Sequence, residues 1–233
     1  MSAALDPGLL ARLAAVDTPS VCNAVEVAEG RRGFGRYTRR PFGAVHGGGT
    51  MVGRARTARI QSAVPDHAAP EDTRSRRRAY YRHMASGDGP RLAVVEDMSG
   101  AAMAGAWWGE VHGHAHLALG LSGAITNGLV RDTDAIPPEF GVLGGGYGPS
   151  HAFVHVVDLG HPVAIHGLVV RDGDLVHADR HGACVIPEAV LPDLADALDR
   201  MTASEAAIID PCREPLSIEA FEEAWAAFEL ART

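Results

Sequence analysis

The segment of this sequence best suited to chemistry runs from Gly109 to Asp132 and reads GEVHGHAHLALGLSGAITNGLVRD. Its pattern predicts a helix opened by Gly109, then a glycine-rich turn, then a strand over 124–130 that ends in an adjacent arginine and aspartate. The backbone N–H groups at the start of a helix are free to bind an anion such as a carboxylate. The segment could therefore hold an organic acid beside two opposite charges.

Arg131 and Asp132, the two charged residues that end this segment, suit complementary tasks. Arginine is a permanent planar cation, which fits a carboxylate or a developing enolate. Aspartate is a hard oxygen ligand for Mg²⁺ or Mn²⁺, directly or through a bound water. On spacing alone, the pair could equally be a surface ion pair that follows a core strand.

The chain of 233 residues lacks lysine, because all 21 of its basic residues are arginines. Without a lysine amine there is no Schiff base, which excludes lysine-dependent aldolases and pyridoxal-phosphate enzymes. A P-loop NTPase is excluded as well, because its Walker A loop needs a lysine. Any enolate chemistry would therefore need another electron sink, and a metal ion is the obvious one.

Charge and cysteine content narrow the partners and the compartment. The chain has 29 acidic residues and a net charge of −8, which argues against nucleic acid or an anionic membrane as a partner. Its three cysteines are far apart and form neither a disulfide framework nor a metal motif. No segment predicts a signal peptide or a transmembrane helix. We expect a cytoplasmic protein with a small-molecule substrate.

Helical and strand patterns alternate along the chain and must position the Gly109–Asp132 segment. One helix is expected to begin at Asp6, and a second to begin with Thr18 as its cap and to end at Gly30. Further helices are expected over 71–85, 108–119, 187–209 and 217–230. Strands are expected at 51–61, 91–97 and 124–130, and repeatedly within 140–186. This order predicts a single α/β layered domain over 1–233, with a core at about 18–190 and C-terminal helices at 187–230.

Several ordered motifs resemble the RraA-like family, which includes the 4-hydroxy-4-methyl-2-oxoglutarate aldolases and the regulator-of-ribonuclease-activity proteins. In the central segment the resemblance rests on Gly109-Glu110, Gly120, Gly123, Asn127-Gly128 and Val130-Arg131-Asp132. Elsewhere it rests on TPSVCNA at 18–24, VGRART at 52–57, VRDGDLVHAD at 170–179 and VIP at 185–187. The resemblance runs from about Thr18 to the final helix.

The resemblance implies a swivelling, phosphohistidine-domain-like β/β/α fold, assembled as a homotrimer or homohexamer with sites near subunit interfaces. It implies that Asp132 binds a divalent metal, Mg²⁺ or Mn²⁺, and that Arg131 contacts the substrate. The substrate carboxylate would be bound by the backbone of four consecutive residues, Gly109, Glu110, Val111 and His112.

The implied activity is a divalent-metal-dependent carbon–carbon lyase that acts on a 2-keto acid through a metal-stabilised enolate. An aldolase of the 4-hydroxy-2-oxoacid type or an oxaloacetate-type decarboxylase fits this description. Two alternatives stay open. One is another enolate-type reaction, such as an isomerisation or cyclisation in a biosynthetic pathway, and the other is a non-catalytic protein-binding regulator.

Some positions depart from the family pattern. His112 stands where leucine is common, Gly145 where many members have arginine, and Asn23 where aspartate is common. Two arginine-rich segments, about 31–49 and 66–91, are longer than expected. Each departure could change the wall of the pocket and thus the substrate.

The histidines of the HGHAH motif have two interpretations. His112 and His116 are four residues apart on one helical face, a spacing that can hold Zn²⁺, but no third ligand follows by spacing. Pocket or surface histidines are the simpler interpretation. His112 lies in the predicted carboxylate-binding turn and could act as an acid–base group. The basic run at 74–78 most simply indicates a solvated helix face or an oligomer interface.

Overall fold

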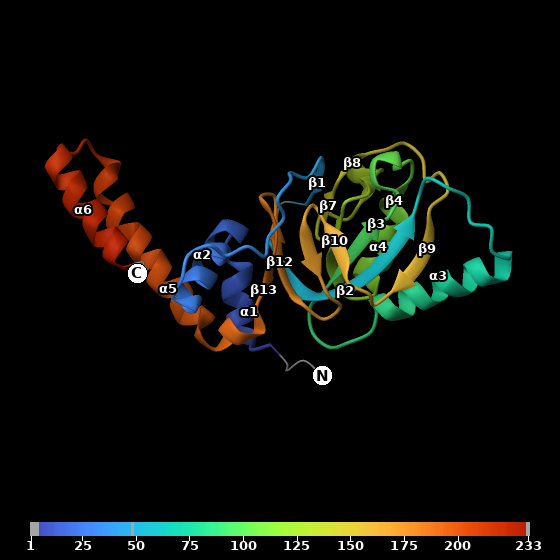
Figure 1. The fold of residues 1–233 in the computed structure, drawn as a ribbon, viewed down its shortest axis with the longest axis horizontal. Coiled ribbons are helices and arrows are strands. Elements are labelled where there is room, and N and C mark those ends of the chain that lie inside the picture. The colour runs from blue at the N-terminus through green and yellow to red at the C-terminus, as the bar shows by residue number, and fades with distance from the viewer. Residues whose placement is uncertain (1–4, 48, 232–233) are drawn as a thin grey trace.

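An eight-stranded mixed sheet forms the centre of the molecule in the computed structural model, which describes residues 5–47 and 49–231 (Figure 1). The strand order is β1-β7-β5-β3-β2-β12-β13, and β9 pairs with β2. Strands β2, β3, β5 and β7 are parallel neighbours, and the other pairings are antiparallel. The strands are β1 Ala44–His46, β2 Met51–Gln61, β3 Arg91–Asp97, β5 Leu121–Thr126, β7 Gly141–Gly144, β9 His155–Leu159, β12 Leu175–Asp179 and β13 Gly182–Ile186.

Two small sheets complete the β structure. In the first, β4 (Ala106–Trp108), β6 (Leu129–Val130) and β8 (Gly146–Tyr147) are parallel, with β6 in the middle. In the second, β10 (Val163–Ile165) and β11 (Leu168–Val170) form an antiparallel hairpin. The three-stranded sheet matters for function, because the chain leaves β4 at Gly109 and β6 at Arg131.

The helices cover the ends and faces of the main sheet. They are α1 Pro7–Ala14, α2 Thr18–Glu29, α3 Pro70–Met84, α4 Glu110–Ala118, α5 Leu191–Ile209 and α6 Ile218–Ala231. Figure 1 shows α1, α2 and α5 beside β12 and β13, α3 beside β9 at the other end, and α6 extending away from the sheet. None of these helices is long and apolar enough to cross a membrane, within the part of the chain that the structure describes.

Local capping explains where the first helices begin. The carboxylates of Asp6 and Asp17 accept hydrogen bonds from the backbone N–H groups of Leu9 and Ser20, and a proline follows each cap. The expected cap at Thr18 is therefore one residue too late. The second helix ends at Gly30, which has a left-handed φ of 63° that glycine adopts without strain.

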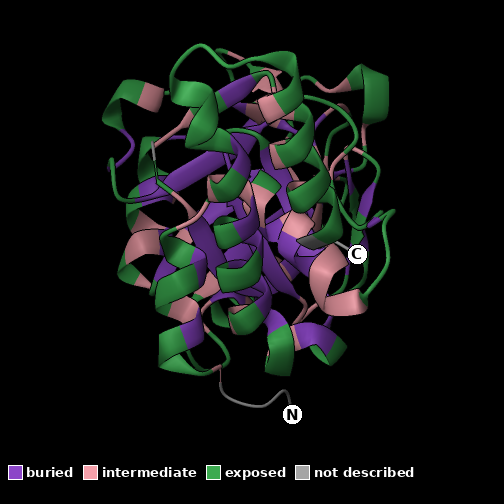
Figure 2. Cartoon of the chain, turned by 90° about the vertical axis from the view of Figure 1, so that its left-hand side faces the viewer, coloured by how far each residue is buried: buried purple, intermediate pink, exposed green. Residues whose placement is uncertain are grey.

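Apolar side chains gather in three buried clusters, which Figure 2 shows as the purple interior behind exposed helix faces. One lies between α1, α2, α5 and the β12–β13 edge, and one under the β10–β11 hairpin. The third joins α3 to β4 through fully buried Tyr80, Met84 and Trp108. This arrangement confirms the predicted α/β class, and β2 and β3 match the predicted strands residue for residue.

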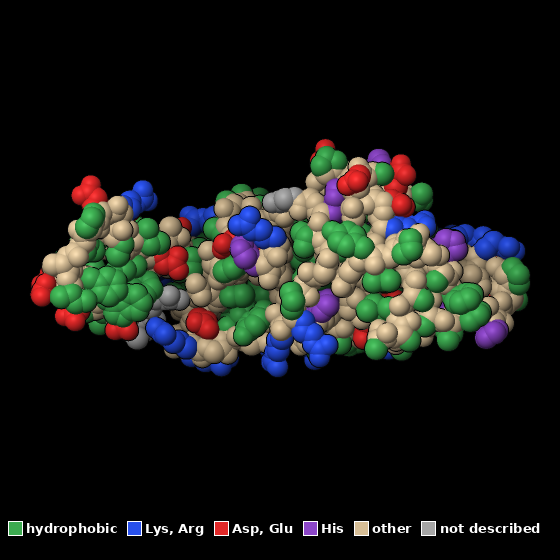
Figure 3. All heavy atoms as spheres, turned by 90° about the horizontal axis from the view of Figure 1, so that it is seen from above, with side chains coloured by type: hydrophobic (Ala, Val, Ile, Leu, Met, Phe, Trp, Pro, Cys, Tyr) green, Lys and Arg blue, Asp and Glu red, His purple; other side chains and the backbone are tan. Residues whose placement is uncertain are grey.

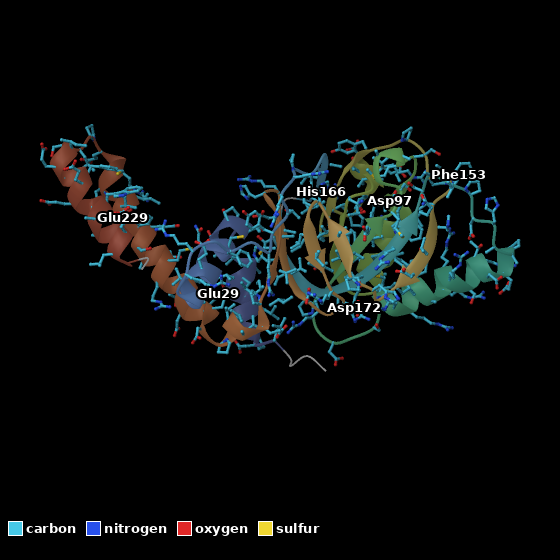
Figure 4. All side chains as sticks on the ribbon, viewed as in Figure 1. Glu29, Asp97, Phe153, His166, Asp172 and Glu229 are labelled. Carbon is cyan, nitrogen blue, oxygen red and sulfur yellow. The ribbon has the colours of Figure 1, made fainter. Side chains whose placement is uncertain are left out.

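The predicted strand at 124–130 is wrong. The chain forms β5 only as far as Thr126, turns at Asn127-Gly128, and enters the small sheet as β6. Asn127 causes the break, because its side-chain amide accepts from the Asp97 N–H at 2.8 Å and donates to the Asp97 carbonyl at 2.9 Å (Asp97 is labelled in Figure 4). The predicted helix at 108–119 likewise begins two residues later, since Trp108 belongs to β4.

Replacing Asn127 by alanine should therefore destabilise the fold. Asn127→Ala leaves both backbone groups of Asp97 without these partners, and we expect the free energy of unfolding to fall by about 1–3 kcal/mol. Chemical denaturation measures it. Asn23→Ala is the control, because among the described residues the Asn23 side-chain amide makes one long contact, 3.5 Å to Glu205. An equal, small change in both variants would contradict the role given to Asn127.

Candidate functional site

The paired ends of β4 and β6 bring the predicted site residues together. The Arg131 N–H donates to the Trp108 carbonyl at 2.9 Å, which places Gly109 beside Arg131. The backbone of Gly109 is so close that a Cβ there would lie 3.0 Å from Asp132 Oδ2 and 3.1 Å from Arg131 Cγ. The helix start, the cation and the carboxylate therefore converge at one point.

Gly109 is the N-cap of α4, and its extended backbone directs the chain into the first helical turn. The N–H groups of the next residues, Glu110, Val111 and His112, have no acceptor within the helix. They sit at the positive end of the helix dipole, which favours an anion. These four residues are the ones predicted to bind a substrate carboxylate, and that role stays a prediction.

A cavity of about 330 Å³ opens at this point. Its walls include the first turn of α4, Arg131, Trp107 of β4 and Arg77 of α3. His151 and Val154 also line the cavity. Exposed Phe153, from the same segment, is labelled in Figure 4 at the end of the sheet far from α6. A cavity of this size accommodates a small organic acid.

Asp132 is not among the residues that line the cavity, but it pairs with the lining residue Arg131 and has an unusual backbone conformation. Its φ is 51°, and only Ala152 and His166 share a positive φ among the described non-glycine residues. Its carboxylate lies 3.2 Å from Arg131 Nε, with the two side chains 48% and 35% exposed. An ion pair this exposed adds little stability, so it does not account for the strained backbone. Such strain is typical of functional positions.

The donor set around Asp132 decides which metal would fit. Nowhere in the described chain do three or more histidine, cysteine, aspartate or glutamate side chains lie close enough to hold an ion. Mg²⁺ typically keeps several waters and binds one or two carboxylates plus substrate oxygens. Half-exposed Asp132 fits that kind of site, in which the substrate completes the coordination.

His112 reaches the cavity from α4, and its ring lies 4.4 Å from the Trp107 ring, centroid to centroid. Burial lowers the pKa of His112 to about 3, and the nearby charges of His116 and Arg77 act in the same direction. The imidazole is therefore neutral at pH 7. The acid–base role of His112 stays a prediction. A neutral His112 ring can donate or accept a hydrogen bond, as a catalytic histidine with a lowered pKa does in other enzymes.

His116 is a core residue with no access to a zinc ion. Its Nε2 lies 2.8 Å from the Tyr80 hydroxyl and its Nδ1 lies 2.6 Å from the His112 carbonyl, so both ring nitrogens are engaged. Trp107 Nε1 also donates to the Tyr80 hydroxyl, at 3.3 Å. This network joins α3, α4 and β4 behind the cavity, and it removes the interpretation of HGHAH as a zinc motif.

Gly145 shows why one family position differs here. A Cβ at Gly145 would collide with the Asn127 carbonyl, so this backbone leaves no room for the arginine common in the family. The Gly145 N–H donates to the Gly128 carbonyl at 2.8 Å, which binds the 144–146 segment to the turn before β6. The glycine run is thus close packing beside the site.

Two cavity residues with ionisable side chains, Arg77 and His151, were not among the predicted site residues. Arg77 belongs to the basic run that was interpreted as a solvated face or an oligomer interface. Helical spacing carried a signal, because Arg77 precedes the buried Tyr80 by three residues and the half-buried Tyr81 by four. His151 lies in a loop, where periodicity gives no information.

Comparison with known proteins identifies the chain's relatives. The profile of the RraA-like family, described as Aldolase/RraA, matches residues 18–185. This chain belongs to the RraA-like family. None of the curated proteins matches it.

Solved structures of this RraA-like fold are similar over nearly the whole chain. Streptomyces coelicolor RraAS2, an unusual member of the RNase ES inhibitor RraA protein family, is 26% identical, with a TM-score of 0.66 over 88% of this chain and 98% of that one. An uncharacterized protein from Pseudomonas syringae pv. tomato str. DC3000 is 18% identical, with a TM-score of 0.72 over 96% of both chains. The second likeness concerns the fold alone.

The buried state of His116 predicts a dependence of stability on pH. Burial lowers its pKa from 6.5 to about 4. Between about pH 6.5 and 4, His116 is therefore protonated in the unfolded chain but stays neutral in the folded chain. His116 thus stabilises the fold fully above pH 6.5, and this contribution falls by up to about 1.4 kcal/mol per pH unit on acidification.

His116→Gln should flatten the decline of unfolding free energy between pH 6.5 and 4, measured by urea denaturation at several pH values. The readout is the slope, because the variant also loses its contact with Tyr80. His114→Gln, at an exposed position of the same helix, should keep the wild-type slope. Parallel curves for all three proteins would show that His116 does not titrate as described.

Proposed function

We propose that this chain is a divalent-metal-dependent carbon–carbon lyase that acts on a 2-keto acid through an enolate. The observation that carries the proposal is the convergence of the Gly109 helix start, Arg131 and Asp132, in which Gly109 and Arg131 line one cavity and Asp132 pairs with Arg131 beside it. Membership of a family described as Aldolase/RraA supports it. The proposal includes Mg²⁺ or Mn²⁺ as the metal and a cytoplasmic homotrimer or homohexamer, as the family resemblance implies.

The residues of the site divide the work. The backbone amides of the first turn of α4 would bind the carboxylate of the keto acid. Arg131 would donate hydrogen bonds to the oxygen atoms of that carboxylate and so orient it. A divalent ion bound at Asp132 would supply Lewis-acid stabilisation of the charge that develops on the keto oxygen. Neutral His112 would hold a hydrogen bond to the bound acid. Trp107 excludes water from that side and so strengthens each electrostatic contact.

The absence of lysine makes this division necessary. In oxaloacetate, the bond between the 3- and 4-carbons breaks, carbon dioxide leaves, and the electron pair stays on the pyruvate fragment as an enolate. A lysine imine would accept that pair in other aldolases, but this chain has none. Arg131 is a permanent cation beside Gly109 and Asp132, where it would stabilise the enolate without a proton transfer.

Asp132→Ala should abolish metal-dependent release of pyruvate. We expect a loss of at least about 10²–10³ in rate with Mg²⁺ or Mn²⁺, the usual effect of removing one electrostatic partner of the transition state. Pyruvate formed from oxaloacetate and from 4-hydroxy-2-oxoacids is measured, with and without a chelator. Asp134→Ala, an exposed neighbour in the following turn, is the control. Full turnover by the Asp132 variant would refute this site.

Gly109→Ala should weaken ligand binding more than it weakens the fold. The extended φ of −175° suits alanine, but the new methyl group would press on Asp132 and Arg131. We expect the affinity for oxalate, a mimic of the pyruvate enolate, to fall by about tenfold or more. Calorimetry measures it, and Gly35→Ala, which has open space around it, is the control. Unchanged oxalate affinity would show that the close approach at Gly109 is irrelevant to binding.

A second candidate function is a protein-binding regulator, favoured by the 26% identity to RraAS2 of the RNase ES inhibitor family. The two functions give opposite results. A regulator would bind a ribonuclease of that type and release no pyruvate from any 2-keto acid with added metal. Pyruvate release that depends on Asp132 would favour the lyase.

A further inference from the structure

Arg77 differs from the other arginines in its run. Arg74 and Arg78 both pair with Glu71 at 2.8 Å, and Arg76 pairs with Asp66 at 2.5 Å. Arg77 forms no hydrogen bond or ion pair with any residue in the described ranges 5–47 and 49–231. It is also the member of this run that lines the cavity. Its guanidinium is therefore free for a ligand.

The position of Arg77 is built into the fold. It lies one turn before Tyr80, whose fully buried ring anchors α3 against Trp107 and His116. Arg76 holds the same turn of α3, because it also donates to the Val156 carbonyl of β9 at 2.9 Å. Asp66 accepts from Arg76 and from the Thr73 hydroxyl, and these bonds hold the pKa of Asp66 well below its usual range.

The charge of Arg77 acts inside the cavity. It contributes to the lowering of the pKa of His112, a residue of α4 that lines the same cavity. Figure 3 shows basic side chains gathered at the end of the molecule that carries α3. The cavity thus has two guanidinium groups, from Arg77 and Arg131, on separate elements, and Glu110 is its one acidic lining residue.

We infer that Arg77 is a specificity-determining residue, which binds a second carboxylate at the far end of the substrate. The inference rests on the proposed function, because it takes the first carboxylate to be bound by α4 and Arg131. A monocarboxylic acid would satisfy only that first anchor. An acid with two carboxylates would span the cavity and satisfy both guanidinium groups. Arg77 thus sets the chemical class of substrate without touching the reacting atoms.

A matched pair of ligands tests this inference by binding alone. 2-Oxoglutarate and 2-oxopentanoate have the same five-carbon chain and differ only in a terminal carboxylate or methyl group. Neither has the 4-hydroxyl group that aldol cleavage requires. Calorimetry with Mg²⁺ present should show that the wild-type protein binds 2-oxoglutarate about five- to tenfold more tightly, the effect of one partly exposed charged hydrogen bond.

Arg77→Gln should abolish this preference by weakening 2-oxoglutarate binding and leaving 2-oxopentanoate within about twofold, and Arg77→Lys should keep part of it. Arg78→Gln is the matched control, since Arg78 is the next residue of α3 and already pairs with Glu71. It should keep the wild-type preference. The wild-type preference should also weaken as salt is raised.

The outcomes separate this inference from the proposed reaction. A protein that releases no pyruvate but loses its preference through Arg77→Gln would refute the lyase and keep the second carboxylate site. Equal binding of the two acids by the wild-type protein, failure to bind either, or equal effects of the Arg77 and Arg78 variants would overturn the inference.

Discussion

The pairing of two very short parallel strands governs the whole site. Strands β4 and β6 together offer five residues, yet the bond from the Arg131 N–H to the Trp108 carbonyl sets Gly109 against Arg131 and Asp132. So small a sheet is not stable by itself. It is held from both sides, by Trp108 buried in the core and by the Asn127 amide bonded to the end of β3. The site geometry is therefore a consequence of core packing.

The same packing explains the electrostatics of the cavity. Tyr80, Trp107 and Trp108 surround the two inward histidines of α4, and burial keeps both imidazoles neutral at physiological pH. Permanent positive charge at the cavity comes from the guanidinium groups of Arg77 and Arg131, which do not lose their proton in proteins. An anion site built in this way keeps its charge across the pH range in which a histidine site would switch.

How much of this could be predicted from the sequence depended on the kind of signal. An alternating pattern predicted β2 and a short apolar run predicted β3, each to the residue. The ordered glycines and the Arg131-Asp132 pair indicated the family. The break after Thr126 was missed, because the apolar pattern continues through Leu129 and Val130 while the cause is a side-chain bond to Asp97, 30 residues earlier. Partners that distant in sequence leave no periodic trace.

Arg77 illustrates the same limit for function. A run of arginines on a polar helix has the composition of a solvated face, and most of its members are indeed neutralised by Glu71 or Asp66. What distinguishes Arg77 is the absence of such a partner within the described chain, together with the turn that it shares with buried Tyr80. Both facts depend on the tertiary structure. An unpaired cation held against a cavity by its neighbours' ion pairs is a preorganised group, because the cost of ordering the helix has been met before a ligand arrives.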